Sequence, residues 1–258
     1  MIEVHNLTFG YSSTEDGQIL KGVDFAAKNG KLTALIGTNG AGKSTLLKTI
    51  MGILKGKGDI TINGKSVSQY STKDFSSTVS YLSQDNDCRV NLTVFEVVML
   101  GRMGSMSFRV SDEDIAATQE VLDRLNLQRF ASRSIMELSG GQRQLVFMAQ
   151  ALVKEPKILI LDEPTSALDL HKQFDLLTLL KNLTQENDFT TLVTLHHLDL
   201  AAMFADEIIV LKDGRVYAQG APEDIFTEAM MEDVYRVKTK IYMDDKGMPH
   251  VIPLEAIN

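Results

Sequence analysis

Residues 37–44 read GTNGAGKS, and this spacing of glycines, lysine and serine matches the phosphate-binding P-loop. The segment lies between an apolar run that ends at Ile36 and a helical pattern over residues 45–51. In this context the glycines allow successive backbone N–H groups to converge on phosphates at a helix N-terminus. Lys43 is predicted to reach the β and γ phosphates of a nucleotide, and the Ser44 hydroxyl to bind magnesium. The residues expected to contact the nucleotide are Gly37, Thr38, Asn39, Gly40, Ala41, Gly42, Lys43, Ser44 and Thr45.

Short β-branched and apolar runs recur between helical patterns along the chain. They lie at residues 31–36, 59–62, 78–82, 158–161, 190–195 and 207–211. This alternation predicts an α/β fold with a largely parallel sheet and helices around it. The runs at 158–161 and 191–195 hardly alternate in polarity, which is typical of central strands that are buried on both faces.

The strand pattern stops between residue 85 and about residue 136, where apolar residues such as Val121, Leu122 and Leu125 recur at helical spacing. We interpret this part as a helical insertion. After Gly214, residues 222–226 (PEDIF) and a last segment with Gly247, Pro249 and Pro253 predict a short helix and a small C-terminal extension. The expected organisation is a single domain of three parts. They are a nucleotide-binding core at 1–84 and 157–215, a helical subdomain at 85–156 and the extension at 216–258.

Charge and composition exclude several classes of protein. The net charge of −8, with scattered Lys and Arg residues, argues against a nucleic-acid partner. The single cysteine, Cys88, excludes an internal disulfide and a multi-cysteine metal site. The chain starts without a secretory signal, and no segment approaches the roughly 18 apolar residues of a membrane span. We therefore expect no direct membrane insertion, and any action at a membrane would need another protein.

Two carboxylates, Asp162 and Glu163, directly follow the apolar run at 158–161. This position places them at the C-terminal edge of the predicted sheet, where the P-loop also lies. Asp162 is expected to hold magnesium through water, and Glu163 to polarise the attacking water. Acidic pairs after strands are usually helix caps, but Pro164 follows here and the pairing with a P-loop makes that alternative minor.

A second candidate phosphate-binding loop lies before a helical run that stops near Pro156. This loop is the pentapeptide LSGGQ at residues 138–142, which should occur by chance in only roughly a few per ten thousand chains of this length. A serine cap followed by two glycines exposes N–H groups at a helix start. One chain needs one P-loop for one ATP, so the second loop is predicted to serve the nucleotide of a partner copy. Its residues are Leu138, Ser139, Gly140, Gly141 and Gln142.

These motifs, in this order, resemble the ATP-binding subunits of ABC transporters over the whole chain. The resemblance implies a P-loop NTPase (RecA-like) core with an N-terminal antiparallel β-subdomain. It implies that Gln84 contacts the attacking water and also binds magnesium, so that Gln84, Ser44 and Asp162 form the magnesium site. It further implies that His196 touches the γ-phosphate. Tyr11 would stack on adenine, although packing is an equally good interpretation of this tyrosine. A D-loop that crosses the dimer interface would comprise Ser166, Ala167, Leu168 and Asp169.

The resemblance also implies ATP and Mg²⁺ as cofactors, and a homodimer in the ATP-bound state. Transmembrane permease subunits, with an extracytoplasmic substrate-binding protein, would place the chain at the cytoplasmic face of the cell membrane. Gly101-Arg102 and Val234-Tyr235 resemble ATPases of importers for ferric siderophores, haem and cobalamin, so we predict iron(III)-siderophore import. The helical insertion, with its apolar stretch at 92–100, is expected to dock the permease. The same stretch also fits a buried helix, and the two expectations are compatible.

Other functions stay open at this point. An exporter ATPase would share all the catalytic motifs. A non-transport ABC protein would need a long coiled coil or a basic surface, and neither is visible in the sequence. A translation factor of the superfamily normally carries two cassettes, and a nucleotide-binding regulator would lack the general base expected at Glu163.

Overall fold

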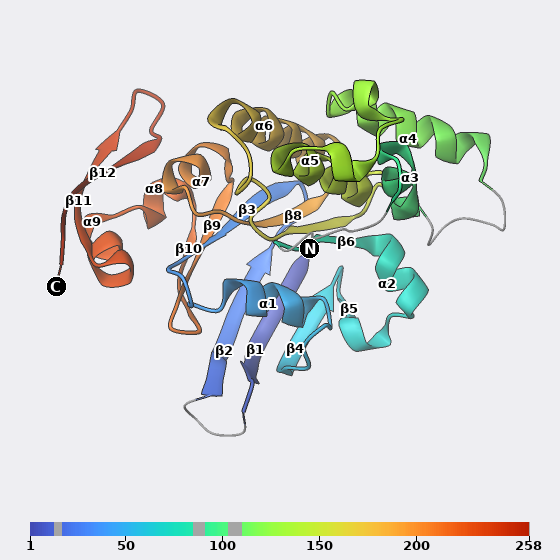
Figure 1. Cartoon of the computed structure of the whole chain (residues 1–258). Coiled ribbons are helices and arrows are strands. Elements are labelled where there is room, and N and C mark those ends of the chain that lie inside the picture. Colours follow the sequence, from blue (N-terminus) through green and yellow to red (C-terminus); the bar gives the residue numbers. More distant parts are fainter. Residues whose placement is uncertain (13–16, 85–90, 103–109, 258) are drawn as a thin grey trace. The chain divides into compact units, whose positions relative to one another are not determined.

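The structure is a computed structural model that describes residues 1–12, 17–84, 91–102 and 110–257 (Figure 1). Cys88 therefore lies outside the described residues. The chain divides into two compact units. Unit 1 comprises Met1–Gln69 and Leu180–Asn258, and unit 2 comprises Tyr70–Leu179.

An antiparallel sheet forms the N-terminal part of unit 1 (Figure 1). Its strand order is β2-β1-β4-β5. The bounds are β1 Ile2–Gly10, β2 Gln18–Ala27, β4 Lys57–Ile62 and β5 Lys65–Ser66. Ile2, Val4 and Leu7 of β1 are buried, so this strand contributes to the core of unit 1. The sheet confirms the predicted N-terminal antiparallel subdomain.

A second sheet in unit 1 carries the strands that lead to the P-loop. β3 pairs in parallel with both β8 and β9, and β10 is antiparallel to β9. The apolar residues of β3 are fully buried, as expected of a strand covered on both faces. The strands are β3 Lys31–Ile36, β8 Thr190–Thr194, β9 Glu207–Lys212 and β10 Arg215–Gly220. Helices α1 Lys43–Ile50 and α7 Leu198–Phe204 and the 3₁₀ turn Val67–Gln69 belong to the same unit. Helix α6, Leu170–Glu186, contains the boundary between the two units.

The C-terminal segment of unit 1 contains more regular structure than the sequence predicts. Short helices α8 Pro222–Ile225 and α9 Glu228–Met230 are followed by a π-helical turn, Met231–Tyr235. A hairpin of β11 Val237–Met243 and β12 Pro249–Ala256 ends the chain. Pro249 and Pro253 argue against a strand in the sequence. Each strand of a two-stranded ribbon has a free edge, however, and proline is tolerated there.

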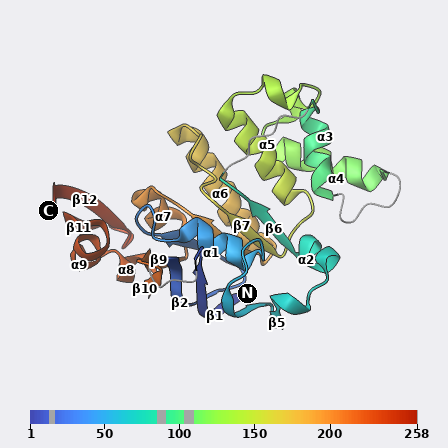
Figure 2. The same cartoon turned by 60° about the horizontal axis from the view of Figure 1, so that its bottom comes forward.

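Unit 2 combines a pair of parallel strands with a group of helices. β6 Val79–Leu82 pairs with β7 Ile158–Leu161, and both follow their predicted runs closely. Figure 2 shows α3, α4 and α5 side by side. The helices are α2 Thr72–Thr78, α3 Val94–Met99, α4 Asp112–Arg124 and α5 Gly140–Leu152, with 3₁₀ turns at Leu100–Arg102, Gln128–Phe130 and Ile135–Glu137.

Capping boxes determine where three helices of unit 2 begin. In each box the side chain of the N-cap residue accepts from the backbone N–H of the residue three positions later. The side chain of that later residue accepts in turn from the backbone N–H of the N-cap residue. These pairs are Thr93 with Glu96 for α3, Ser111 with Asp114 for α4 and Ser139 with Gln142 for α5. The predicted second phosphate-binding loop is therefore the capped start of a helix.

Helix α3 covers most of the apolar stretch at 92–100. Val94, Val97 and Val98 are at most 1% exposed, which makes this stretch chiefly a core helix. Leu100, at its end, is exposed. Within the described parts of the chain, none of the helices combines the length and the apolar character needed to cross a membrane.

Candidate nucleotide-binding site

The P-loop of unit 1 connects β3 to α1 through glycines with positive φ. Gly37, Gly40 and Gly42 have φ values of 146°, 80° and 104°, which other residues adopt only with strain. A side chain on Gly37 would also collide with the carbonyl oxygen of Leu211. Gly42 is the N-cap of α1 and has no side chain that could occupy the N–H groups of the first helical turn. This is the arrangement by which helix N-termini bind phosphate.

Lys43 lies against the loop that precedes it. Only 6% of the residue is exposed. Its Nζ donates to the carbonyl oxygens of Gly37 at 2.8 Å and Thr38 at 3.0 Å. The loop thus holds the ammonium group at the start of α1, where the loop's N–H groups would meet the phosphates.

His196 follows β8 in unit 1, and the P-loop follows β3. The two strands are parallel, with Leu35 opposite Thr194, and the Leu195 N–H donates to the Leu35 oxygen at 3.4 Å. Both segments therefore leave the same end of neighbouring strands, which is where open α/β sheets bind ligands. His196 is exposed.

Tyr11 lies at the surface of unit 1, just beyond β1. It is 70% exposed, and its ring meets Phe9 edge to face with centroids 5.0 Å apart. Most of the ring is thus available to a planar ligand. Stacking on adenine remains a prediction.

Gln84, Asp162 and Glu163 meet at one edge of unit 2. Gln84 follows β6, and the two carboxylates follow the parallel strand β7. Gln84 Nε2 donates to Glu163 Oε2 at 2.7 Å, while Asp162 is buried and its N–H donates to the Leu82 oxygen at 2.8 Å. The structure thus joins residues that the sequence could only place at the ends of two separate strands.

Glu163 has a strained backbone. Its φ of 51° lies in the left-handed region, which is uncommon for residues other than glycine and tends to occur at functional sites. The Ser166 hydroxyl, in the predicted D-loop, donates to the Glu163 carbonyl oxygen at 3.1 Å. The D-loop therefore helps to hold the turn that presents the carboxylate.

The capped start of α5 contacts the D-loop within unit 2. The Gln142 N–H donates to Ser139 Oγ at 3.4 Å, and the Ser139 N–H donates to Gln142 Oε1 at 2.9 Å. A Cβ on Gly141 would lie 2.8 Å from the Ala167 oxygen, so this close approach favours glycine. Ser139 and Gly140 are exposed and can face another molecule.

A family model described as ABC transporter matches residues 20–166, more than half of the chain. The chain belongs to the ABC transporter family. An uncharacterized ABC transporter ATP-binding protein of Methanocaldococcus jannaschii is 40% identical over 256 residues, which cover 98% of each chain. The iron(3+)-hydroxamate import ATP-binding protein of Bacillus subtilis is 36% identical over 248 residues, which cover 95% of this chain and 91% of that protein.

Solved structures agree with this family membership. An ABC transporter described as of the metal-chelate type, in an inward-facing conformation, matches with a TM-score of 0.83 at 28% identity, covering 98% of this chain and 97% of that one. A dimeric ATP-binding cassette in a post-hydrolysis state with ADP and Pi matches with a TM-score of 0.78 at 30% identity, covering 86% of this chain and 98% of that one. These similarities confirm the predicted fold class, and the chain is an ABC ATPase.

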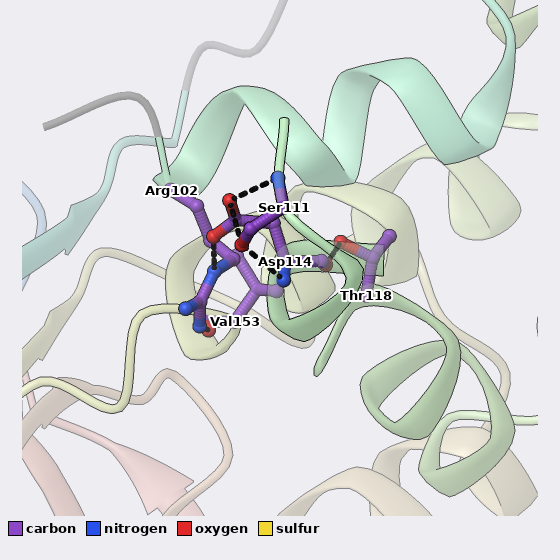
Figure 3. A network of polar contacts seen from close by, with 5 residues as sticks. All are labelled: Arg102, Ser111, Asp114, Thr118 and Val153. Atoms are coloured by element: carbon purple, nitrogen blue, oxygen red, sulfur yellow. Dashed lines mark hydrogen bonds and ion pairs between the residues drawn. The ribbon is translucent and has the colours of Figure 1, made fainter. Parts of the chain in front are cut away.

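A polar network that the sequence analysis missed connects three segments of unit 2 in this ABC ATPase (Figure 3). Arg102 Nε donates to Asp114 Oδ1 at 2.6 Å, and Arg102 Nη1 donates to the Val153 oxygen at 3.1 Å. The Ser111 hydroxyl donates to Asp114 Oδ2 at 2.7 Å, and Thr118 Oγ1 donates to the Asp114 carbonyl oxygen at 2.7 Å. Only the capping-box spacing from Ser111 to Asp114 could have signalled it in the sequence.

The network gives Asp114 a pH-dependent role in stability. The hydrogen bond from Arg102, followed by those from Ser111, lowers the pKa of Asp114 from 3.8 to about 2. Because the folded state lowers this pKa, the stabilisation is complete above the unfolded value and is lost as the pH falls toward 2. We expect the difference in urea midpoint between wild type and Asp114→Asn to be constant from neutral pH to about pH 5 and to shrink below it.

Asp112→Asn is the matched control for this measurement, because Asp112 is an exposed carboxylate in the same first turn of α4. Its difference from wild type should change much less over the same pH range. A difference for Asp114→Asn that stays constant down to pH 3 would show that the ion pair with Arg102 does not contribute charge-dependent stability.

Proposed function

We propose that this ABC ATPase drives the import of an iron(III)-siderophore, or of haem or cobalamin, through a membrane permease. The observation that carries the import class is the similarity to an iron(3+)-hydroxamate import ATP-binding protein over 95% of the chain. That similarity includes much of the C-terminal segment, beyond the part matched by the family model. The chain would act at the cytoplasmic face of the membrane, with a substrate-binding protein on the other side.

The residues fit ATP with Mg²⁺. Ser44, Gln84 and Asp162 offer a hydroxyl, an amide oxygen and a carboxylate, which are the hard oxygen donors that magnesium prefers. Gln84 directs its Nε2 toward Glu163, so its Oε1 is the end available to a cation. When bound, the ion would neutralise charge on the phosphates.

Hydrolysis would depend on Glu163 as the general base. The Gln84 amide fixes one carboxylate oxygen at 2.7 Å, which restricts the carboxylate to few orientations. A fixed carboxylate can take the proton of a water molecule aimed at the γ-phosphate. Lys43 would stabilise the phosphate charge, and His196 would contact the γ-phosphate from the end of β8.

Two copies would close with each ATP between the P-loop of one and the Ser139 end of α5 of the other. The exposed, capped start of α5 supports this arrangement, since a helix N-terminus with exposed glycine N–H groups can bind an anion from a second molecule. The solved cassette with ADP and Pi is also dimeric. Closure would assemble both sites, and hydrolysis would reopen them.

A groove of unit 2 is the proposed docking surface for the permease. It has a volume of about 740 Å³ and includes acidic and basic side chains. Leu100 and Arg102 line one part, Glu113 and Glu120 of α4 another, and Lys154 follows α5. This mixture fits a polar permease segment better than the buried apolar residues of α3 do.

Affinity purification of the tagged chain from its native membranes tests the transport function. Mass spectrometry should identify a permease with many membrane spans, together with a metal-chelate-binding protein. Recovery of only soluble or nucleic-acid-bound partners would keep the ATPase activity but overturn the import function. The permease protein identified in this way would also show whether the transporter is an importer or an exporter.

Lys43→Ala tests the nucleotide site. The substitution removes a charge-assisted contact to phosphate, so ATP affinity should fall by roughly 10- to 100-fold, as follows from about 1.5–3 kcal/mol for such a bond. Isothermal titration with a non-hydrolysable ATP analogue measures this change. Lys48→Ala, in the last turn of the same helix, is the matched control and should bind as wild type does. Unchanged affinity in Lys43→Ala would contradict the P-loop assignment.

A further inference from the structure

A buried side chain of unit 2 holds the loop between β7 and α6. Gln173 lies in the first turn of α6 and is only 7% exposed. Its Nε2 donates to two carbonyl oxygens of the loop, those of Thr165 at 3.1 Å and Leu168 at 3.1 Å. A side-chain amide has two N–H donors, so both donors of Gln173 serve this one loop. The amide therefore fixes the loop at both ends of residues 165–168.

The fixed segment connects the proposed general base to the predicted D-loop. Ser166 begins the D-loop, and its N–H and its hydroxyl both donate to the Glu163 carbonyl oxygen, at 3.3 Å and 3.1 Å. The Thr165 oxygen also accepts from the Leu168 N–H at 3.1 Å. A displacement of Thr165 would therefore move Ser166, and with it the turn that presents the Glu163 carboxylate.

The same segment lies against the start of α5. A Cβ on Gly141 would lie 2.8 Å from the Ala167 oxygen and 3.3 Å from Leu168 Cδ2. The start of α5 is the part of the chain that is proposed to bind the ATP of a partner copy. The amide of Gln173 thus holds a segment that contacts both the turn of the general base and the second phosphate-binding loop.

Burial makes the two bonds from Gln173 difficult to replace. Thr165 and Leu168 are 4% and 7% exposed, whereas Ser166 and Ala167 between them are exposed. The loop is thus anchored at its buried ends and presents its tip to the surface. A buried carbonyl oxygen that loses its donor is unfavourable, so the loop would shift toward water or other donors if the amide were removed.

We propose that Gln173 is a positioning residue for ATP hydrolysis: its amide fixes the D-loop and thereby the turn that carries Glu163. The inference rests on the proposed function, in which Glu163 is the general base. Gln173 acts through the loop and is not itself proposed to contact the nucleotide. A carboxylate that is held in few orientations takes a proton from water more readily than a mobile one. Loss of the amide should therefore slow hydrolysis and leave ATP binding unchanged.

Gln173→Met is the direct test, because it keeps an unbranched side chain of similar length but removes both donors. The rate constant of a single turnover, measured with protein in saturating excess over ATP, should fall roughly 5- to 50-fold, as expected from two lost neutral hydrogen bonds. Affinity for a non-hydrolysable ATP analogue should stay within twofold of wild type, because the P-loop is unchanged. Under these conditions the rate constant does not depend on the folded fraction, so a partly unfolded sample would give the wild-type value.

Thr184→Val is the matched control on the same helix. Thr184 is 1% exposed, and its hydroxyl forms hydrogen bonds with the Leu180 oxygen at 2.6 Å and Thr191 Oγ1 at 2.6 Å. The substitution also removes two buried hydrogen bonds of α6, but these do not reach the D-loop. Its urea midpoint should fall as that of Gln173→Met does, while its single-turnover rate constant stays at the wild-type value. An equal loss of rate in both variants would overturn the inference, because the loss would then follow from a less stable α6.

A double variant shows whether the effect passes through Glu163. Changes that act through one group are not additive. In the Glu163→Gln background, Gln173→Met should therefore change the residual rate constant by less than twofold. The same fold-loss in both backgrounds would contradict the inference, because Gln173 would then act independently of the general base.

Gln173→Asn keeps the test decisive if Gln173→Met does not fold. It retains the amide, but its side chain is one methylene shorter and cannot reach both carbonyl oxygens. Its single-turnover rate constant should fall roughly 2- to 10-fold, as expected from one lost neutral hydrogen bond. A folded variant of either kind that hydrolyses ATP at the wild-type rate would overturn the positioning role.

Two further outcomes distinguish the inference from the function on which it rests. If Glu163→Gln loses hydrolysis and Gln173→Met keeps the wild-type rate constant, the positioning role is wrong and the general base stands. If Glu163→Gln itself keeps its turnover, the proposed general base fails, and the positioning role fails with it.

Discussion

Glu163→Gln should reduce steady-state ATP hydrolysis by on the order of 10²- to 10⁴-fold, which is the usual contribution of a general base. The amide that replaces the carboxylate cannot accept a proton from water. Its oxygen can still accept the hydrogen bond from Gln84 Nε2, so the geometry of the turn after β7 should persist. ATP binding should stay near the wild-type affinity, because the P-loop belongs to another part of the chain. Phosphate release measures the rate, and titration with labelled ATP measures binding.

Glu155→Gln is the matched control for this result. Glu155 is also a glutamate of unit 2 with a left-handed backbone, at φ 50°, and it is exposed. The control therefore reproduces the change from Glu to Gln in the same backbone conformation and should hydrolyse ATP at the wild-type rate. Turnover that survives in Glu163→Gln would show that another group activates the water.

The strain at Glu163 also needs a physical reason. A residue other than glycine in the left-handed region costs about 1–2 kcal/mol. Glycine at this position would relieve the cost but remove the carboxylate. The bond from the Ser166 hydroxyl to the Glu163 carbonyl, at 3.1 Å, stabilises the turn locally. The conformation therefore persists at the position where the proposed reaction needs a carboxylate as its general base.

The sequence predicts best those elements whose pattern is local. β3 and β7 have the bounds of their apolar runs because each run ends at a loop with a strong signal, the P-loop or the acidic pair. α5 begins at the predicted cap, Ser139, for the same reason. The hairpin of β11 and β12 was not predicted, since Pro249 and Pro253 count against strands unless the strands are known to lie at an edge.

Contacts between distant residues could not be read from the sequence. The P-loop and the acidic pair are visible as motifs. The bond from Gln84 to Glu163 depends on the parallel pairing of β6 with β7. An isolated glutamine has no pattern of its own. The family resemblance supplied a role for Gln84, but nothing in the motifs pointed to its contact with Glu163.

Ser139→Arg should leave ATP binding by the monomer intact and abolish the ATP-dependent dimer. Ser139 is exposed at the start of α5, so the longer side chain would occupy the space where the γ-phosphate of the partner copy is proposed to lie. Loss of the cap costs about 1 kcal/mol, which is small for a helix anchored by the buried Val146, Phe147 and Met148. Analytical ultracentrifugation with ATP, in the Glu163→Gln background that prevents turnover, measures the dimer.

Ser71→Arg is the matched control, because Ser71 is also an exposed serine N-cap of a helix in unit 2 and accepts from the Asp74 N–H at 3.1 Å. It loses the same kind of cap and gains the same charge at a helix that is not proposed to meet a nucleotide. Arginine would attract a phosphate by charge alone, so a dimer lost only in Ser139→Arg must be lost through the volume of the side chain. A normal dimer in Ser139→Arg would mean that the start of α5 does not face the nucleotide of the partner copy, and the second phosphate-binding loop would need another role.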